Sequence, residues 1–160
     1  MKRFILVDYE KCHGCNSCTL ACSFAKTKEF NPTRASVTIV HLPDQGNLTF
    51  PVLCQNCLEP PCLEVCPAQA ITRDEESGVT SINEKLCIGC KLCVMACPIG
   101  GPWVDARESR IMKCDLCEGD PKCVKYCGFE ALQFVSAEEA AYKKRKEGAK
   151  KLSELLKKQG

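Results

Sequence analysis

Cysteine is the residue type in this chain whose spacing could do chemistry. Sixteen of the 160 residues are cysteine, and they form four groups of four with none left over. Four thiolates supplied by one such run are the ligands that hold a cubane iron–sulfur cluster. The groups are Cys12, Cys15, Cys18, Cys22; Cys54, Cys57, Cys62, Cys66; Cys87, Cys90, Cys93, Cys97; and Cys114, Cys117, Cys123, Cys127. The spacing therefore predicts four [4Fe–4S] clusters, with all sixteen cysteines as metal ligands.

Two other uses of cysteine fit this spacing less well. Disulfide frameworks belong to exported chains, and the first eight residues lack the apolar run of a signal peptide. We therefore expect a cytoplasmic protein with reduced thiols. Structural zinc sites join Cys-x2-Cys pairs through long spacers, whereas the run from Cys87 to Pro98 reproduces the ferredoxin pattern Cys-x2-Cys-x2-Cys-x3-Cys-Pro. Zinc or mixed sites are the alternative.

The composition predicts a fold that depends on its metal. One Trp, three Tyr and six Phe give a thin aromatic core, and small metallo-domains often fold only with metal bound. The formal charge of +2 counts every thiol as neutral, and four clusters with their thiolates would bring it to about −6. Residues 1–136 carry 14 basic against 16 acidic side chains, and residues 137–160 carry 8 against 4. We expect a ferredoxin-like domain at 1–136, a basic helical tail at 137–160 and no membrane span.

Short elements must position the cysteines in an α+β fold. β-Branched and apolar runs between turn residues predict strands at 4–7, 37–40, 48–53, 71–72, 79–82 and 132–135. Short helices are expected around 19–21 and 94–96. The tail predicts a helix over 137–158, with Ser136 as its cap and a kink at Gly148. One narrow stripe of this helix contains Tyr142, Arg145, Ala149, Leu152 and Leu156.

The cysteine groups must also pair, because the fourth cysteine of a ferredoxin run ligates the other cluster of its pair. Groups two and three both end in Cys-Pro, whereas groups one and four end in Cys-Ser and Cys-Gly. This difference favours two dicluster ferredoxin units nested in one chain, with groups one and four in the outer unit and groups two and three in the inner unit. Sequential pairing stays open, because the spacer between groups three and four is also short.

The order of the four motifs, over about residues 4–135, resembles that of four-cluster iron–sulfur subunits of molybdenum and tungsten oxidoreductases. The compact fourth group is most similar to that of the polyferredoxin-like subunits of tungsten aldehyde:ferredoxin-oxidoreductase-type enzymes. The resemblance implies nested pairing and a core dominated by clusters. The ligand sets that it implies are Cys12, Cys15, Cys18, Cys127; Cys114, Cys117, Cys123, Cys22; Cys54, Cys57, Cys62, Cys97; and Cys87, Cys90, Cys93, Cys66.

The resemblance also implies an electron-transfer subunit without catalysis of its own. Its partners would be a catalytic tungsten or molybdenum subunit, which could oxidise aldehydes, and a ferredoxin or a flavin subunit that reduces NAD. The alternatives are a free-standing polyferredoxin, or a partner of carbon monoxide dehydrogenase or hydrogenase. No glycine-rich nucleotide loop or nucleophile–base pair is present. The tail is expected to pack on a partner or on a second copy of the chain, and it lacks any nucleic-acid reader motif.

Five residues near the cysteines have both a functional and a plain structural interpretation. The cysteines make His13 unnecessary as a ligand, and Trp103 is expected to serve packing more than electron relay. Lys11, Lys85 and Lys113 each lie one or two positions before the first cysteine of a group. They either raise cluster potentials by opposing the cluster charge or are solvated lysines on loops.

Overall fold

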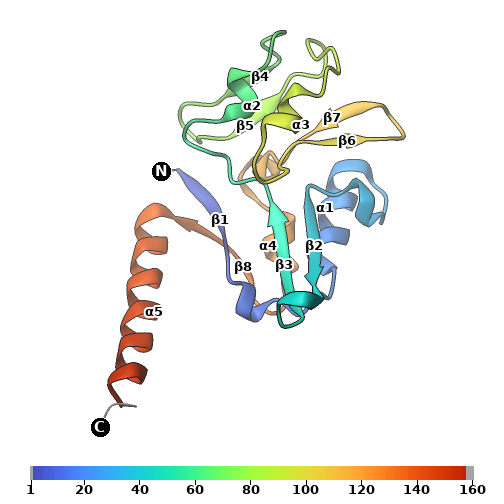
Figure 1. Cartoon of the computed structure of the whole chain (residues 1–160). Helices are drawn as coiled ribbons and strands as arrows, with labels where there is room; N and C mark the ends of the chain where they lie inside the picture. The colour runs from blue at the N-terminus through green and yellow to red at the C-terminus, as the bar shows by residue number, and fades with distance from the viewer. Residues whose placement is uncertain (1, 158–160) are drawn as a thin grey trace.

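The computed structural model describes residues 2–157 of the chain. Within this range the strands pair into four separate two-stranded antiparallel sheets, with short helices between them. Figure 1 shows two lobes, one above the other, and a long C-terminal helix that runs down beside the lower lobe. This mixture of helices and small antiparallel strand pairs agrees with the predicted α+β class.

The lower lobe joins segments from both ends of the region that precedes the tail. Its elements are β1 (Arg3–Val7), α1 (Ser17–Thr27), β2 (Val37–Leu42), β3 (Leu48–Leu53), α4 (Lys122–Lys125) and β8 (Leu132–Ser136). β1 pairs with β8 so that Ile5 lies opposite Phe134, and α1 packs against α4. The helix that carries the last two cysteines of the first group thus contacts the helix of the fourth group.

The upper lobe contains the middle of the chain. Its elements are α2 (Pro61–Glu64), β4 (Ile71–Arg73), β5 (Thr80–Ile82), α3 (Leu92–Ala96), β6 (Trp103–Asp105) and β7 (Arg110–Met112). α2 packs against α3, and β4 pairs with β5 so that Ile71 lies opposite Ile82. The helices of the second and third cysteine groups are therefore neighbours. The β6–β7 hairpin lies near the boundary between the lobes (Figure 1).

The buried core has two parts, and cysteine side chains contribute to both. In the lower part, the buried side chains are Ile5, Cys18, Cys22, Ala35, Val37, Leu53, Cys54, Cys114, Leu116, Cys123 and Leu132. In the upper part, they are Cys62, Ile71, Cys93 and Ile111. Ordinary aliphatic residues thus surround the thiols, so that ligand positions and hydrophobic packing are fixed together.

A buried arginine ties the β6–β7 hairpin to the lower lobe. Arg34, in the 3-10 turn Pro32–Arg34, donates from Nε to Asp105 Oδ2 at 2.9 Å and also pairs with Glu108. Burial raises the pKa of Asp105, but hydrogen bonds from Arg34 and from backbone amides, together with the charge of Arg34, outweigh that effect and hold this pKa below its usual value. Trp103 Nε1 adds a hydrogen bond to Ser36 Oγ at 3.2 Å. Trp103 therefore joins two parts of the fold, as its packing interpretation predicts.

The predicted elements before the tail are present, with some differences in extent. α1 runs from Ser17 to Thr27, well beyond the short helix expected around 19–21. The β6–β7 hairpin and the single-turn helices α2 and α4 were not predicted. Residues 103–112 contain no long run of residues with high β-propensity, so the sequence did not predict this hairpin.

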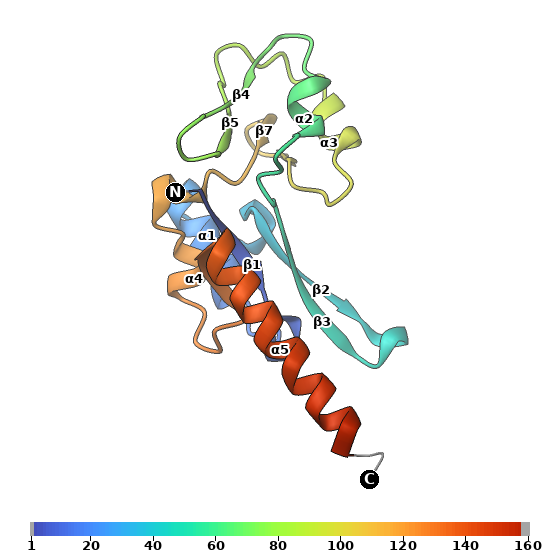
Figure 2. The same cartoon turned by 90° about the vertical axis from the view of Figure 1, so that its left-hand side faces the viewer.

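The C-terminal helix α5 (Ala137–Lys157) begins with a capping box and leaves the body after its first turns (Figure 2). Glu139 N donates to Ser136 Oγ at 3.2 Å, and Ser136 N donates to Glu139 Oε2 at 2.8 Å, so the predicted cap is confirmed. The helix is continuous through Gly148, where a kink was expected. Residue 158 lies outside the described residues. No helix within 2–157 has the length and apolar character needed to cross a bilayer.

Candidate metal centres

The two loops with Cys-x2-Cys-x2-Cys spacing have the same backbone conformation. Gly14 and Gly89 have φ angles of 70° and 69°, and Asn16 and Lys91 have φ angles of 60° and 65°. Directly after these left-handed residues, α1 and α3 begin. A β-carbon on Gly14 would approach His41 Cε1 to 2.9 Å, so this position requires glycine. The two motifs with the same spacing thus share a loop geometry that turns three cysteines toward one space.

The structure gathers the cysteines into four sets, named here after the first cysteine of each. Each set combines three cysteines of one group with the last cysteine of another. Cavities are lined by the Cys12 set (Cys12, Cys15, Cys18, Cys127), the Cys54 set (Cys54, Cys57, Cys62, Cys97) and the Cys87 set (Cys87, Cys90, Cys93, Cys66). The Cys114 set (Cys114, Cys117, Cys123, Cys22) lies mostly in the core of the lower lobe.

Three of the four thiols in the Cys114 set are buried, namely Cys22, Cys114 and Cys123. Burial and the nearby charges of Cys114 and Cys22 raise the pKa of Cys123 far above its ordinary value. The charge of Cys117 acts on Cys123 in the same direction. Burial likewise raises the pKa of Cys114 to about 12. The buried thiols Cys22, Cys114 and Cys123 all have raised pKa values, so they need a positive centre among them before they can ionise together.

The third cysteine of every group shows the same effect. Cys18, Cys62, Cys93 and Cys123 are all buried, and burial is the largest cause that raises the pKa of each. A lone thiol in such a place would keep its proton. A bound metal centre supplies the positive charge that stabilises a buried thiolate, so each of the four sets has a member suited to metal ligation.

The remaining donors around the thiols also fit iron–sulfur chemistry. All sixteen cysteines are free thiols. The last cysteine of three groups accepts a backbone amide hydrogen bond, from Ser36 N to Cys22 at 3.2 Å, from Ala70 N to Cys66 at 3.3 Å and from Gly101 N to Cys97 at 3.1 Å. Such N–H···S bonds stabilise cluster sulfurs. In residues 2–157, no three His, Cys, Asp or Glu side chains converge in the manner of a single-ion site, and the thiols surround spaces instead.

The four sets adjoin one another in a single order. The charge of Cys62 acts on Cys93, which makes the Cys54 and Cys87 sets neighbours. The charge of Cys54 acts on Cys114, and the two thiols share the core of the lower lobe. The charge of Cys18 acts on Cys123. The sets therefore follow one another as Cys87, Cys54, Cys114 and Cys12 through the two lobes.

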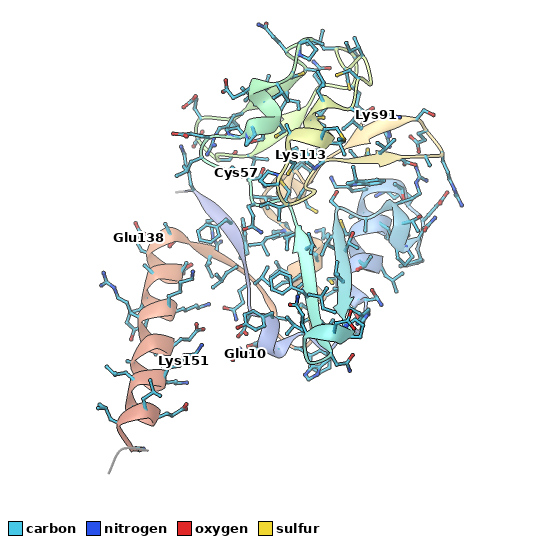
Figure 3. The ribbon with its side chains drawn as sticks, viewed as in Figure 1. Glu10, Cys57, Lys91, Lys113, Glu138 and Lys151 are labelled. Carbon is cyan, nitrogen blue, oxygen red and sulfur yellow. The ribbon has the colours of Figure 1, made fainter. Side chains whose placement is uncertain are left out.

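The three lysines that precede cysteine groups differ in burial. Lys11 and Lys85 are exposed, and Lys11 pairs with Asp8 at 3.6 Å. Lys113 is buried and lines the same cavity as the Cys54 set (Figure 3). Its positive charge opposes the effect of burial on the pKa of Cys62. Only for Lys113, among these three, does the structure favour the functional interpretation.

Sequence reasoning missed several polar residues near the thiols. Lys26 lies one turn beyond Cys22 on α1, and its largely buried ammonium pairs with Asp115 at 2.9 Å. That pair lies near Cys22 and Cys114. The i, i+4 spacing from Cys22 was the signal that could have revealed Lys26. Asn56 and Thr80 carried no such signal, because only the folded chain brings them to Lys113.

His13 takes a packing role in the described structure. Its ring meets the ring of Phe129 edge-on, with centroids 4.5 Å apart. The two side chains both line the cavity of the Cys12 set. His13 therefore covers that cavity beside Phe129.

Comparison with known proteins agrees with this chemistry. Residues 46–138 match the 4Fe–4S dicluster domain. The chain belongs to the 4Fe–4S dicluster family. The polyferredoxin-like subunit of aliphatic sulfonate oxidoreductase from Pyrococcus furiosus is 36% identical to this dicluster protein over 136 residues, which cover 83% of the chain and 78% of the relative.

Two further relatives of the dicluster protein carry electron-transfer or oxidoreductase names. The electron transport protein HydN of Escherichia coli is 35% identical over 159 residues, and the match covers 84% of the chain and 89% of HydN. The beta subunit of NADH-dependent phenylglyoxylate dehydrogenase from Aromatoleum evansii is 36% identical over 133 residues, with 82% of the chain but only 30% of the relative covered. The prediction of an iron–sulfur electron-transfer protein of this kind is confirmed.

Proposed function

We propose that this member of the 4Fe–4S dicluster family is a non-catalytic subunit that carries four [4Fe–4S] clusters, two in each of two units, and relays electrons within an oxidoreductase complex. The observation that carries the proposal is the gathering of sixteen free thiols into four sets of four. A bound [4Fe–4S] cluster supplies one-electron redox chemistry at each set. The order in which the sets adjoin supports a linear route from the Cys87 set to the Cys12 set.

The proposed ligand sets correspond to two nested ferredoxin units. The pairing of β1 with β8 and the packing of α1 on α4 support an outer unit built from groups one and four. The packing of α2 on α3 supports an inner unit built from groups two and three. Residues 2–136 would then form the cluster domain, and α5 would be an appended tail.

A catalytic tungsten or molybdenum subunit is the proposed partner, and ferredoxin or a flavin subunit that reduces NAD is the proposed second partner. The names of the relatives support an oxidoreductase context, since one is a subunit of a sulfonate oxidoreductase and another belongs to an NADH-dependent dehydrogenase. Exposed apolar side chains around the Cys87 set also support a docking face for a redox subunit. These side chains are Leu86, Ile88, Leu92 and Met95.

Metal analysis and co-purification test this proposal. Protein prepared without oxygen should contain about sixteen iron and about sixteen acid-labile sulfide per chain. A tagged chain purified from its native cells should bring down a subunit that contains tungsten or molybdenum. Stoichiometric zinc without sulfide would overturn the cluster assignment. Recovery of the chain alone, with four clusters, would instead support the free-standing polyferredoxin.

A further inference from the structure

Three polar residues meet inside the upper lobe, next to one of the four cysteine sets. Lys113 Nζ donates to Thr80 O at 2.8 Å and to Asn56 Oδ1 at 3.0 Å. Asn56 Oδ1 also accepts from Thr80 N at 3.1 Å. Lys113 is 7% exposed and Thr80 is fully buried. These contacts fix the ammonium of Lys113 in one place, without access to bulk water.

The charge of Lys113 has no acidic counterpart among its hydrogen-bond partners. Its acceptors in the described part of the chain are neutral oxygens, which belong to Thr80, Asn56 and, at 3.5 Å, the backbone of Cys114. Lys26 beside the Cys114 set differs, because Asp115 pairs with it directly. A full positive charge is therefore left uncompensated at Lys113, whereas the charge of Lys26 is largely neutralised.

Two donors in the same group of residues have no hydrogen-bond partner within residues 2–157. Thr80 Oγ1 and Asn56 Nδ2 are buried and make no hydrogen bond. A buried polar atom without a partner is costly, so each such atom in a native fold calls for an explanation. Thr80 and Lys113 line the cavity of the Cys54 set together with its four thiols. The unpartnered hydroxyl of Thr80 and the uncompensated ammonium thus adjoin one and the same site.

We propose, on the basis of the proposed function, that Lys113 and Thr80 raise the reduction potential of the centre held by the Cys54 set above the potentials of its neighbours. Reduction adds one negative charge to a cluster, and a fixed cation and a hydroxyl donor both stabilise the reduced state. The Cys54 set is the second of four along the route. A centre with the highest potential at this position would hold an electron longer than its neighbours, which are held by the Cys87 and Cys114 sets.

The test is a redox titration of the full-length holoprotein, monitored by electron paramagnetic resonance. A Cys57→Ser variant first identifies the signal of the Cys54 set. Lys113→Met should then decrease the reduction equilibrium constant of that centre at least tenfold, which is about 59 mV for a one-electron couple. Lys113→Arg keeps the charge and should change the constant much less. Lys85→Met, which removes an exposed lysine, is the matched control and should change none of the four potentials.

Thr80→Val provides an independent test, because valine has nearly the same shape and removes a hydroxyl that makes no hydrogen bond within the described residues. The reduction equilibrium constant of the same centre should decrease about threefold, and its potential should fall accordingly. Thr72→Val, at an exposed position on β4, is its control. If Lys113→Met does not assemble, Thr80→Val decides.

The outcomes separate this inference from the proposed function. Iron and sulfide analysis of the wild type counts the clusters, and fewer than four would overturn the proposed function itself. Four clusters with an unchanged Cys54-set potential in Lys113→Met, or with the shift at another centre, would overturn only the role of Lys113. An unchanged potential in Thr80→Val would overturn the role of the hydroxyl.

Discussion

Alanine in place of Cys22 should remove the cluster of a group that lies far away in the sequence. Cys22 is only four positions from Cys18, but the ferredoxin pattern assigns the fourth cysteine of a run to the other cluster of its pair. The structure likewise places Cys22 with Cys114 and Cys123, whereas Cys18 lines a cavity with Cys127. Cys22→Ala should therefore abolish the signal of the Cys114 set and preserve that of the Cys12 set.

The size of the effect follows from what Cys22 contacts. Loss of one of four clusters would lower the iron content from about sixteen to about twelve per chain, with an equal loss of sulfide. Cys22 is 5% exposed, and its sulfur accepts the amide of Ser36 at 3.2 Å. Without that acceptor, the buried amide is left unpaired, which costs about 1–3 kcal/mol of folding free energy in addition to the loss of the metal.

The assay combines iron and sulfide analysis with integration of the electron paramagnetic resonance signal of the dithionite-reduced protein. Cys127→Ala is the reciprocal control, since it should remove the cluster of Cys12, Cys15 and Cys18 and spare that of Cys114. The reasoning would be refuted if Cys22→Ala removed the Cys12-set cluster, or if Cys127→Ala removed the Cys114-set cluster.

Three further predictions concern the stability of the fold and the tail. Leu132→Ala, at a residue that is 2% exposed in the lower core, should lower the free energy of unfolding by about 2–5 kcal/mol in denaturant titrations, and an exposed change such as Thr38→Ala on β2 should not. Removal of iron by a chelator should abolish most of the circular dichroism signal and leave mainly the contribution of α5, because thiols form much of both cores. A native-like spectrum of the metal-free chain would contradict this. Deletion of residues 137–160 should leave iron content unchanged but weaken assembly with the catalytic subunit, as measured by co-purification, and unchanged assembly would reduce the tail to an appendage.

Much of the local fold could be predicted because its signals are local. β-Branched runs and turn residues mark the hairpin of β2 and β3 and that of β4 and β5. The capping box of α5 is visible in the sequence as Ser136 and Glu139. The predicted helix of the tail continues through Gly148, because one exposed glycine costs a helix only about 1 kcal/mol and the flanking residues favour helix strongly.

The cysteines of the candidate sites could be predicted from the sequence, because their residue type and spacing mark them directly. Cysteine spacing marks all sixteen cysteines as candidate ligands, because a cluster demands thiolates at close intervals. The surroundings of the thiols were not predictable, because they depend on contacts between distant segments. Lys113 meets Thr80 and Asn56 across intervals of 33 and 57 residues, and Arg34 meets Asp105 across 71. No periodic pattern marks such pairs, so only the folded chain distinguishes Lys113 from the solvated Lys11 and Lys85.

The pairing of β1 with β8 has a consequence for biosynthesis. Arg3 reaches the carbonyl of Phe134 across 131 residues, so the lower lobe closes only when nearly the whole cluster domain has left the ribosome. The helices α2 and α3 and the β4–β5 hairpin need only neighbouring sequence and can assemble much earlier. In the proposed ligand sets, Cys12, Cys15 and Cys18 would meanwhile wait for Cys127, exposed to oxygen and to competing metals. The thiols of group one, although made first, would therefore be the last to be protected, and delivery of iron to them would follow the emergence of Cys127 from the ribosome.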